Sequence, residues 1–181
     1  MSVLRCALQS DSDLLFKWIN DPVVVKFNAR FQRVQRDDHD TWFSDVTSSP
    51  NVLFRMIQEP ETLQTVGSCQ LILGVDAITT AELRIRIGEK DCWGKGIGSE
   101  AVKELIDLGF NSGFCKSIRL WVRSDNVRAI KSYQKNGFVT IGLEADVKFD
   151  DVKSVGMLIM QINRDETLPT EQTSVDGGND I

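Results

Sequence analysis

Three glycines at alternate positions, Gly94, Gly96 and Gly98, separate a strand-like segment from a helical one. Residues 81–87, before them, alternate apolar and charged side chains with the period of two that is typical of a half-buried strand. After them, apolar residues recur at helical spacing up to about Asn111. The chain is therefore expected to pass from a strand through a glycine-rich turn into an amphipathic helix.

This turn is suited to hold an anion. The first amides of a helix have no intrahelical partner and the helix dipole is positive there, so a bound phosphate gains several hydrogen bonds. A Walker phosphate loop is excluded, because Glu89 stands where its first glycine is required and Gly96 follows Lys95. The dinucleotide-binding fingerprint is excluded by the glycine spacing. An ordinary strand-to-helix turn remains the alternative.

Charge narrows the classes of partner. The formal net charge is −5, and residues 165–181 carry five acidic and no basic residues, so the other 21 acidic residues balance the 21 basic ones. Without a basic excess, nucleic-acid binding is not expected. Residues 165–181 are expected to form a disordered acidic tail behind a single domain of residues 1–164.

Cysteine and histidine are too sparse for the common metal and thiol sites. The four cysteines are widely scattered without a C-x-x-C pair, and His39 is the only histidine. Neither a zinc site nor a Cys–His nucleophile is supported, so no metal is expected. The chain shows no signal-peptide pattern and no long apolar run, so we expect a cytoplasmic protein with no membrane partner.

Periodicity and turn residues divide the rest of the chain. Helices are expected at residues 12–19, 37–44, 98–111 and 127–136. Strands are expected at residues 3–8, 52–59, 65–74, 81–87, 117–122, 140–149 and 153–162, the last two as a hairpin turned at Asp150-Asp151. Residues 23–31 fit either a short helix or an irregular loop.

Residues 126–138 form the second informative stretch. Asn126 fits a helix N-cap, and Gly137 fits a left-handed helix end from which Phe138 returns to the core. Tyr133, the only tyrosine, lies on the apolar face of this helix. It is expected near a buried surface, close to the end of the preceding strand.

With both stretches in view, residues 3–162 resemble the GNAT superfamily of acetyl-CoA-dependent N-acetyltransferases. The superfamily's Q/R-x-x-G-x-G/A pattern falls on residues 93–98, with Trp93 in place of the usual Gln or Arg. Residues 126–138 match its N-x-x-A-x-x-x-Y-x-x-x-G-F stretch at every fixed position. Two motifs at the expected separation make the resemblance specific.

The resemblance implies an α+β fold with a mixed, twisted central sheet of about seven strands flanked by about four helices. The fourth and fifth strands, here residues 81–87 and 117–122, splay apart. Pantetheine pairs with the backbone of the fourth strand, and the pyrophosphate of acetyl-CoA rests on the amides of residues 94–99. The implied contacts of acetyl-CoA are Arg86, Ile87, Trp93, Gly94, Lys95, Gly96, Ile97, Gly98, Ser99 and Asn126.

The implied chemistry is direct attack of a substrate amine on the acetyl thioester. The amine must be neutral to attack, so a base removes its proton, directly or through water. Glu82 is the candidate base, weighed against a solvated strand residue. The amide of Ile87, at a bulge in the fourth strand, is the candidate oxyanion donor. Tyr133 corresponds to the general acid that protonates the departing CoA thiolate.

The acceptor is less constrained than the donor. Residues 18–22, W-I-N-D-P, and the later H-x-x-W-F from His39 resemble bacterial aminosugar N-acetyltransferases that act on nucleotide-linked 4-amino sugars, with Ile19 in place of an arginine. This implies Asn20, Asp21 and an exposed His39 as substrate contacts, with His39 also an alternative base, whereas Trp18 is expected in the core. A protein N-terminal amine, as in ribosomal-protein acetyltransferases, a polyamine, a non-catalytic acyl-CoA-binding module and a homodimer remain open.

Overall fold

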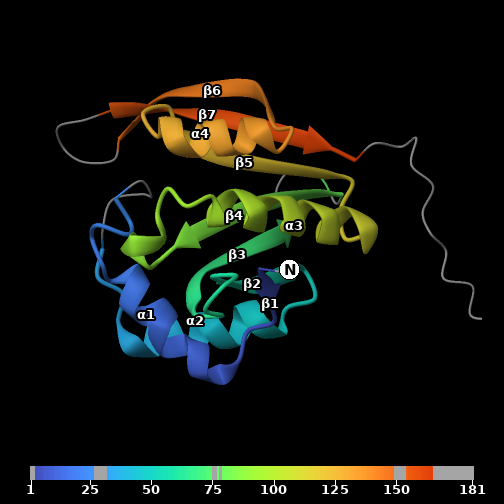
Figure 1. The fold of residues 1–181 in the computed structure, drawn as a ribbon. Helices are drawn as coiled ribbons and strands as arrows, with labels where there is room; N and C mark the ends of the chain where they lie inside the picture. The colour runs from blue at the N-terminus through green and yellow to red at the C-terminus, as the bar shows by residue number, and fades with distance from the viewer. Residues whose placement is uncertain (1–2, 27–31, 75–76, 78, 149–153, 165–181) are drawn as a thin grey trace, which may run out of the picture.

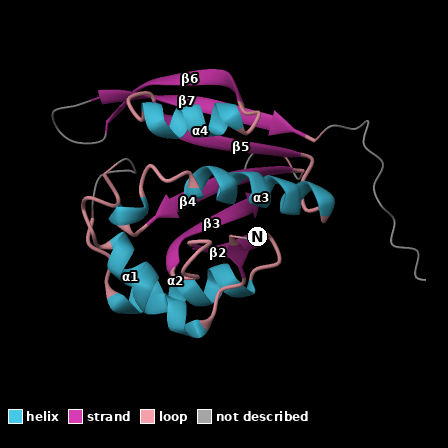
Figure 2. Cartoon of the chain, viewed as in Figure 1, coloured by secondary structure: helices cyan, strands magenta, loops and turns pink. Residues whose placement is uncertain are grey.

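A single seven-stranded sheet organises the chain (Figures 1 and 2). The structure, a computed structural model, describes residues 3–26, 32–74, 77, 79–148 and 154–164. The strands are β1 (Leu4–Arg5), β2 (Val52–Gln58), β3 (Thr65–Leu73), β4 (Thr80–Ile87), β5 (Ser117–Arg123), β6 (Val139–Lys148) and β7 (Ser154–Asn163), in the order β1-β2-β3-β4-β5-β7-β6. The helices are α1 (Ser12–Ile19), α2 (Arg36–Ser48), α3 (Ile97–Asn111) and α4 (Val127–Lys135). This confirms the expected α+β fold with a mixed sheet.

The sheet splits between β4 and β5. These strands are parallel and pair only at their first three positions, ending with Glu82 opposite Arg119. Beyond that point β4 stays paired with β3 up to Ile87, and β5 stays paired with β7 up to Arg123. All other neighbouring strands are antiparallel along their shared length. The two strands therefore diverge, as the resemblance implies, and beyond Glu82 no described strand pairs with this edge of β4.

Two hydrophobic cores cover opposite faces of the sheet. The larger core packs α3 and α4 against alternate strand residues such as Leu71, Leu83 and Leu120. The smaller core packs α1 and α2 against Phe54 and Met56 of β2. Side chains alternate between faces along a strand, so β2 contributes Ile57 to the larger core and Phe54 and Met56 to the smaller one.

The ends of α3 and α4 follow from local sequence. Gly96, at φ 86°, precedes α3 in the left-handed region, and Gly113, at φ 72°, follows it. The Asn126 side-chain oxygen accepts a hydrogen bond from the Ala129 amide at 3.3 Å and so caps α4. Gly137, at φ 87°, ends that helix, which confirms both predicted caps.

Two predicted elements differ in extent by more than one residue at an end, and part of the ambiguous segment is resolved. β1 is shorter than expected, because Asp11 accepts hydrogen bonds from the Arg5 side chain and the Leu8 amide and turns the chain after Arg5. α2 is longer than expected and ends at Ser48, where the extended Ser49 precedes a proline. Residues 22–26 form turns, so the first part of the ambiguous segment is not a helix. The predicted hairpin turn at Asp150-Asp151 and the acidic tail lie outside the described residues.

No helix in the described part of the chain is long and apolar enough to cross a membrane.

Candidate active site

Two cavities meet at the gap between β4 and β5. The larger, about 790 Å³, lies on the side of Glu82, Arg84 and Arg86 and is called the acceptor cavity below. The smaller, about 410 Å³, runs along the glycine turn and α4 and is called the donor groove. The residues that line both are Ile85, Arg86, Asn126 and Tyr133. A ligand in one space can therefore meet a ligand in the other at these four residues.

The backbone of β4 offers hydrogen-bonding groups to this gap. Gly88 donates to the carbonyl of Val66 at 2.8 Å, just beyond the pairing of Gly67 with Ile87. This bond makes Gly67 and Ile87 a non-hydrogen-bonded pair, so the amides and carbonyls of Ile85 and Ile87 point away from β3. Those of Arg86 point toward β3. The expected pairing of pantetheine with the backbone of Arg86 therefore does not fit, whereas Ile85 and Ile87 direct backbone groups to the gap; Arg86 lines both cavities.

The expected bulge lies just past the end of β4. The amides of Gly88 and Glu89 both donate to the Val66 carbonyl, at 2.8 and 3.1 Å, so two residues oppose one there. Before that point the β3–β4 register runs without a shift from Leu73–Ala81 to Gly67–Ile87. The Ile87 amide therefore faces the gap as part of the regular strand, next to the bulge.

The glycine turn presents free amides to the donor groove. Gly94 and Gly96 have φ values of 81° and 86°, in the region that favours glycine. Among the described hydrogen bonds, none is donated by the amides of residues 94–98, whereas the Ser99 amide donates to the Gly96 carbonyl at 2.9 Å. Ser99 is therefore corrected to a side-chain contact of the groove, and its hydroxyl accepts a hydrogen bond from Asn136 at 3.0 Å.

Trp93 fastens this turn to the end of β4. Its indole Nε1 donates to the Ile87 carbonyl at 2.9 Å, and the Arg128 guanidinium lies over the ring at 5.2 Å from its centroid. Where Gln or Arg is usual, Trp93 therefore forms a hydrogen bond that joins the glycine turn to the end of β4. Of the other predicted contacts, the side chains of Lys95 and Ile97 line neither cavity, and Ile97 belongs to the larger core.

Basic residues of α4 add positive charge to the donor groove. Arg128, Lys131 and Lys135 all line it. They recur at spacings of three and four residues, which places them on one side of the helix. That spacing is the signal by which the sequence could have revealed them.

Tyr133 lies at the junction of the two spaces. Its ring packs edge-on against Phe138, with centroids 5.8 Å apart. Burial raises the pKa of Tyr133 to about 12, and its hydroxyl has no hydrogen-bond partner among the described residues. The phenol is therefore protonated and free to donate a hydrogen bond to a ligand at the junction.

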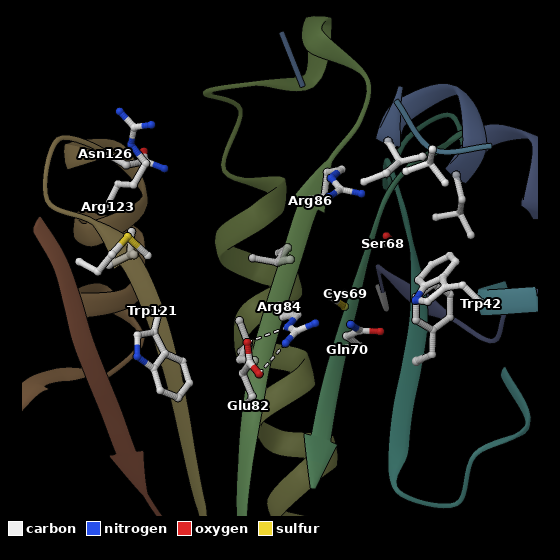
Figure 3. Close-up of a pocket in the computed structure, with 18 of the residues that line it drawn as sticks. Trp42, Ser68, Cys69, Gln70, Glu82, Arg84, Arg86, Trp121, Arg123 and Asn126 are labelled. Carbon is white, nitrogen blue, oxygen red and sulfur yellow. Dashed lines mark hydrogen bonds and ion pairs between the residues drawn. The ribbon is translucent and has the colours of Figure 1, made fainter. Parts of the chain in front are cut away.

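Glu82 and Arg84 form a two-pronged ion pair in the acceptor cavity (Figure 3). Arg84 Nε lies 2.6 Å from one carboxylate oxygen of Glu82, and the second guanidinium nitrogen lies 2.8 Å from the other. The Glu82 side chain is 16% exposed, against 59% for Arg84. Glu82 is thus a shielded carboxylate held in a fixed orientation, rather than a fully solvated strand residue.

The structure moves two predicted substrate contacts away from the acceptor cavity. The Asn20 side chain exchanges hydrogen bonds with the backbone of Val34 at 2.9 and 3.2 Å. Asp21 pairs with Lys90 at 2.7 Å, and this bond lowers the pKa of its carboxyl group. Neither residue lines either cavity. Their hydrogen bonds connect the end of α1 to the segment before α2 and to the segment after β4.

His39 does line the acceptor cavity, but it is not exposed as expected. It is 2% exposed, and Nε2 donates to the Ser12 carbonyl at 2.9 Å. Burial lowers its pKa, so the neutral ring is favoured. Trp18 is 1% exposed and bonds to Glu89 through Nε1 at 2.9 Å, which confirms its expected core position.

Sequence reasoning missed several polar residues of the acceptor cavity. Ser68 and Gln70 of β3 lie on the same face as Arg86 and Arg84, directly opposite them in register. Trp121 and Glu144 lie near the far wall and contact each other at 3.4 Å. The alternation of Arg119, Trp121 and Arg123 in β5 was a usable signal for that wall. Across the described residues, no cluster of three His, Cys, Asp or Glu side chains is arranged to hold a metal ion.

A family model for the acetyltransferase (GNAT) domain matches residues 3–139. An uncharacterized N-acetyltransferase, p20, of Bacillus licheniformis is 30% identical over 86% of this chain and 91% of its own length. The acetyltransferase PseH of Campylobacter jejuni is 23% identical over 74% of this chain and 80% of its own. An uncharacterized Methanocaldococcus jannaschii protein is 27% identical over 75% of this chain, a match that spans only 28% of that protein.

Solved structures share the fold at lower identity. A spermidine N-acetyltransferase from Vibrio cholerae, in complex with CoA and spermine, has a TM-score of 0.78 at 18% identity, over 88% of this chain and 94% of its own. A ribosomal-protein-alanine N-acetyltransferase from Brucella melitensis has a TM-score of 0.77 at 18% identity, over 90% and 100%. The motifs, the split sheet and the family match agree: the chain belongs to the GNAT acetyltransferase family and is an acyltransferase.

Proposed function

We propose that this enzyme moves the acetyl group of acetyl-CoA to a primary amine of a small molecule by direct attack. One observation carries the proposal: the donor groove and the acceptor cavity share Ile85, Arg86, Asn126 and Tyr133 at the gap between β4 and β5. The volume of the acceptor cavity, about 790 Å³, supports a small molecule, since such sites typically measure ~300–1,000 Å³.

The donor groove matches the parts of acetyl-CoA. Its pyrophosphate would accept hydrogen bonds from the free amides of residues 94–98 at the start of α3. Arg128, Lys131 and Lys135 supply positive charge for the phosphates. The pantetheine arm would pair with the edge of β4 at Ile85, as an added strand does. The Ile87 carbonyl already accepts the Trp93 indole, and the Ile87 amide is assigned to the oxyanion below. Asn126, beside the junction, both caps α4 and faces the arm.

The reaction proceeds through attack of the neutral amine on the thioester carbonyl. The carbon–nitrogen bond forms, the carbon–sulfur bond breaks, and the amine proton passes to Glu82, directly or through water. The Ile87 amide stabilises the tetrahedral oxyanion. Tyr133 donates a proton to the departing thiolate, so that free CoA leaves as the thiol.

Turnover is tested by incubating the protein with acetyl-CoA and a panel of amines while free thiol is followed. Nucleotide-linked aminosugars, peptides and polyamines belong in the panel. We expect thiol release with at least one small amine, and a fall in kcat of ~10²-fold or more for Glu82→Gln. Tight CoA binding without turnover across the panel would overturn the proposal in favour of a non-catalytic acyl-CoA-binding module. If the unmodified protein turns over and Glu82→Gln leaves kcat unchanged, acetyl transfer is supported but Glu82 is not the base.

A further inference from the structure

Arg86 is a half-buried cation that has no counter-charge among the described residues. Its Nε is buried without a hydrogen-bond partner, and among the described residues it forms neither an ion pair nor a hydrogen bond. Burial lowers the pKa of its guanidinium group, although arginine remains charged in proteins. A buried charge is costly unless it is paired. A bound anion would therefore supply the counter-charge that the described residues do not give Arg86.

The other charged residues that line the acceptor cavity do not pair with Arg86. Glu82 binds Arg84 through both carboxylate oxygens. Arg123, also in the lining, binds Asp125 at 2.7 Å. Asp38 and Glu144 line the cavity as well, but neither forms an ion pair with Arg86.

The neighbours of Arg86 are uncharged hydrogen-bonding groups. Ser68 is directly opposite Arg86 on β3, and Gln70 is opposite Arg84 (Figure 3). Both are 8% exposed, and the side-chain oxygen of Gln70 is buried without a partner. A serine hydroxyl and a glutamine amide can complete the hydrogen bonds of a bound anion and of a neighbouring ammonium group.

The position of Arg86 indicates that the anion belongs to the acceptor and is not a phosphate of CoA. Its side chain leaves β4 on the face of Glu82 and Arg84, whereas α3 and its glycine turn pack against the opposite face. It also borders the junction with Tyr133, where the acetyl group would be transferred. An anion bound by Arg86 would therefore belong to the molecule whose amine enters this junction.

We propose that the acceptor carries an anionic group in addition to its amine and that Arg86, with Ser68 and Gln70, binds that group. This rests on the proposed function, because it names the acceptor class of the same site. A carboxylate next to the amine, as in an amino acid, and the diphosphate of a nucleotide-linked aminosugar are the two sources of such a charge. Polyamines and neutral amines lack it and leave Arg86 uncompensated.

Binding to the CoA-loaded protein tests this class independently of turnover. Calorimetry is carried out with amino acids, their matched carboxamides, a nucleotide-linked 4-amino sugar and spermidine. We expect an anionic amine to bind at least ~10-fold more tightly than its uncharged counterpart, the scale of one charge-assisted hydrogen bond. Arg86→Gln should abolish that preference and Arg86→Lys should retain part of it. Lys103→Gln, an equal charge change on the exposed face of α3 outside both cavities, should leave it intact.

The outcomes separate the two sources and the two proposals. Arg86-dependent binding of an amino acid identifies a carboxylate, and Arg86-dependent binding of the nucleotide sugar alone identifies a diphosphate. Equal or tighter binding of spermidine or the carboxamides, failure of every anionic amine to bind, or an unchanged preference in Arg86→Gln overturns the inference. If only uncharged amines are acetylated, the anionic-acceptor proposal is wrong and the acetyltransferase proposal is supported. If anionic amines bind through Arg86 but no thiol is released, the anionic-acceptor proposal is supported and the acetyltransferase proposal is wrong.

A stability measurement guards against a misfolded variant. Arg86→Gln removes an uncompensated charge from a shielded site, so its melting temperature without ligand should equal or exceed that of the unmodified protein. A large drop would show that Arg86 holds the fold together rather than waiting for a ligand, which contradicts the inference.

Discussion

Tyr133 has a hydroxyl that is protonated and has no partner among the described residues, at the junction of both cavities. If it protonates the CoA thiolate, Tyr133→Phe should lower kcat by ~10²-fold or more. Its removal should change acetyl-CoA affinity by less than about threefold, because the amides proposed to bind the pyrophosphate are untouched. Single-turnover kinetics with calorimetry of CoA binding check this. An unchanged kcat would remove Tyr133 from the mechanism.

His39 should make stability fall with acidity. Burial lowers its pKa more strongly than the Ser12 carbonyl and nearby acids raise it. The unfolded state therefore binds the proton more readily, so His39 contributes stability that is complete above about pH 6.5 and is lost as the pH falls below that value. Melting temperatures measured from about pH 8 down to about pH 5 should show this loss of stability. His39→Gln should remove this part of the pH dependence; an identical profile would contradict the assignment.

At the scale of elements, the glycine turn is the segment in which sequence dictates conformation most directly. Gly96 has φ 86°, so Gly96→Ala should destabilise the protein by roughly 1–2 kcal/mol. Gly98 lies in α3 without a positive φ, and an added Cβ would meet only Ile87 at 3.5 Å, an ordinary contact. Gly98→Ala is therefore the matched control and should be close to neutral. Equal losses in urea denaturation would show that backbone conformation is not the cause.

Elements with strong local signals were predictable. The glycine turn, the Asn126 cap and the end of α4 at Gly137 all depend on neighbours within a few residues, and all are found. The bond of Trp93 to Ile87 and the ion pair of Glu82 with Arg84 were not predicted. Side-chain direction and strand edge decide both, and apolar periodicity does not encode them. His39 was misplaced for the same reason, because its burial depends on packing between α1 and α2.

For the whole molecule, the divergence of β4 from β5 creates the site. The sequence resemblance implied this split, and the three-residue pairing confirms it. The acceptor cavity depends on contacts between segments far apart in the chain, from α1 and α2 to β5 and β6. Two of its three predicted contacts, Asn20 and Asp21, lie outside it, and Arg86 proved to face it. The residues proposed to bind acetyl-CoA lie within two sequence motifs, whereas tertiary packing decides which residues line the acceptor cavity.

A crystal structure of the protein with CoA tests the central claim most directly. The account predicts that the pyrophosphate accepts hydrogen bonds from amides of residues 94–98 and that pantetheine lies along β4 at Ile85. The thiol should then lie within hydrogen-bonding distance of the Tyr133 hydroxyl and open into the acceptor cavity. A pyrophosphate bound away from the glycine turn, or a thiol that points away from Tyr133 and the acceptor cavity, would contradict it.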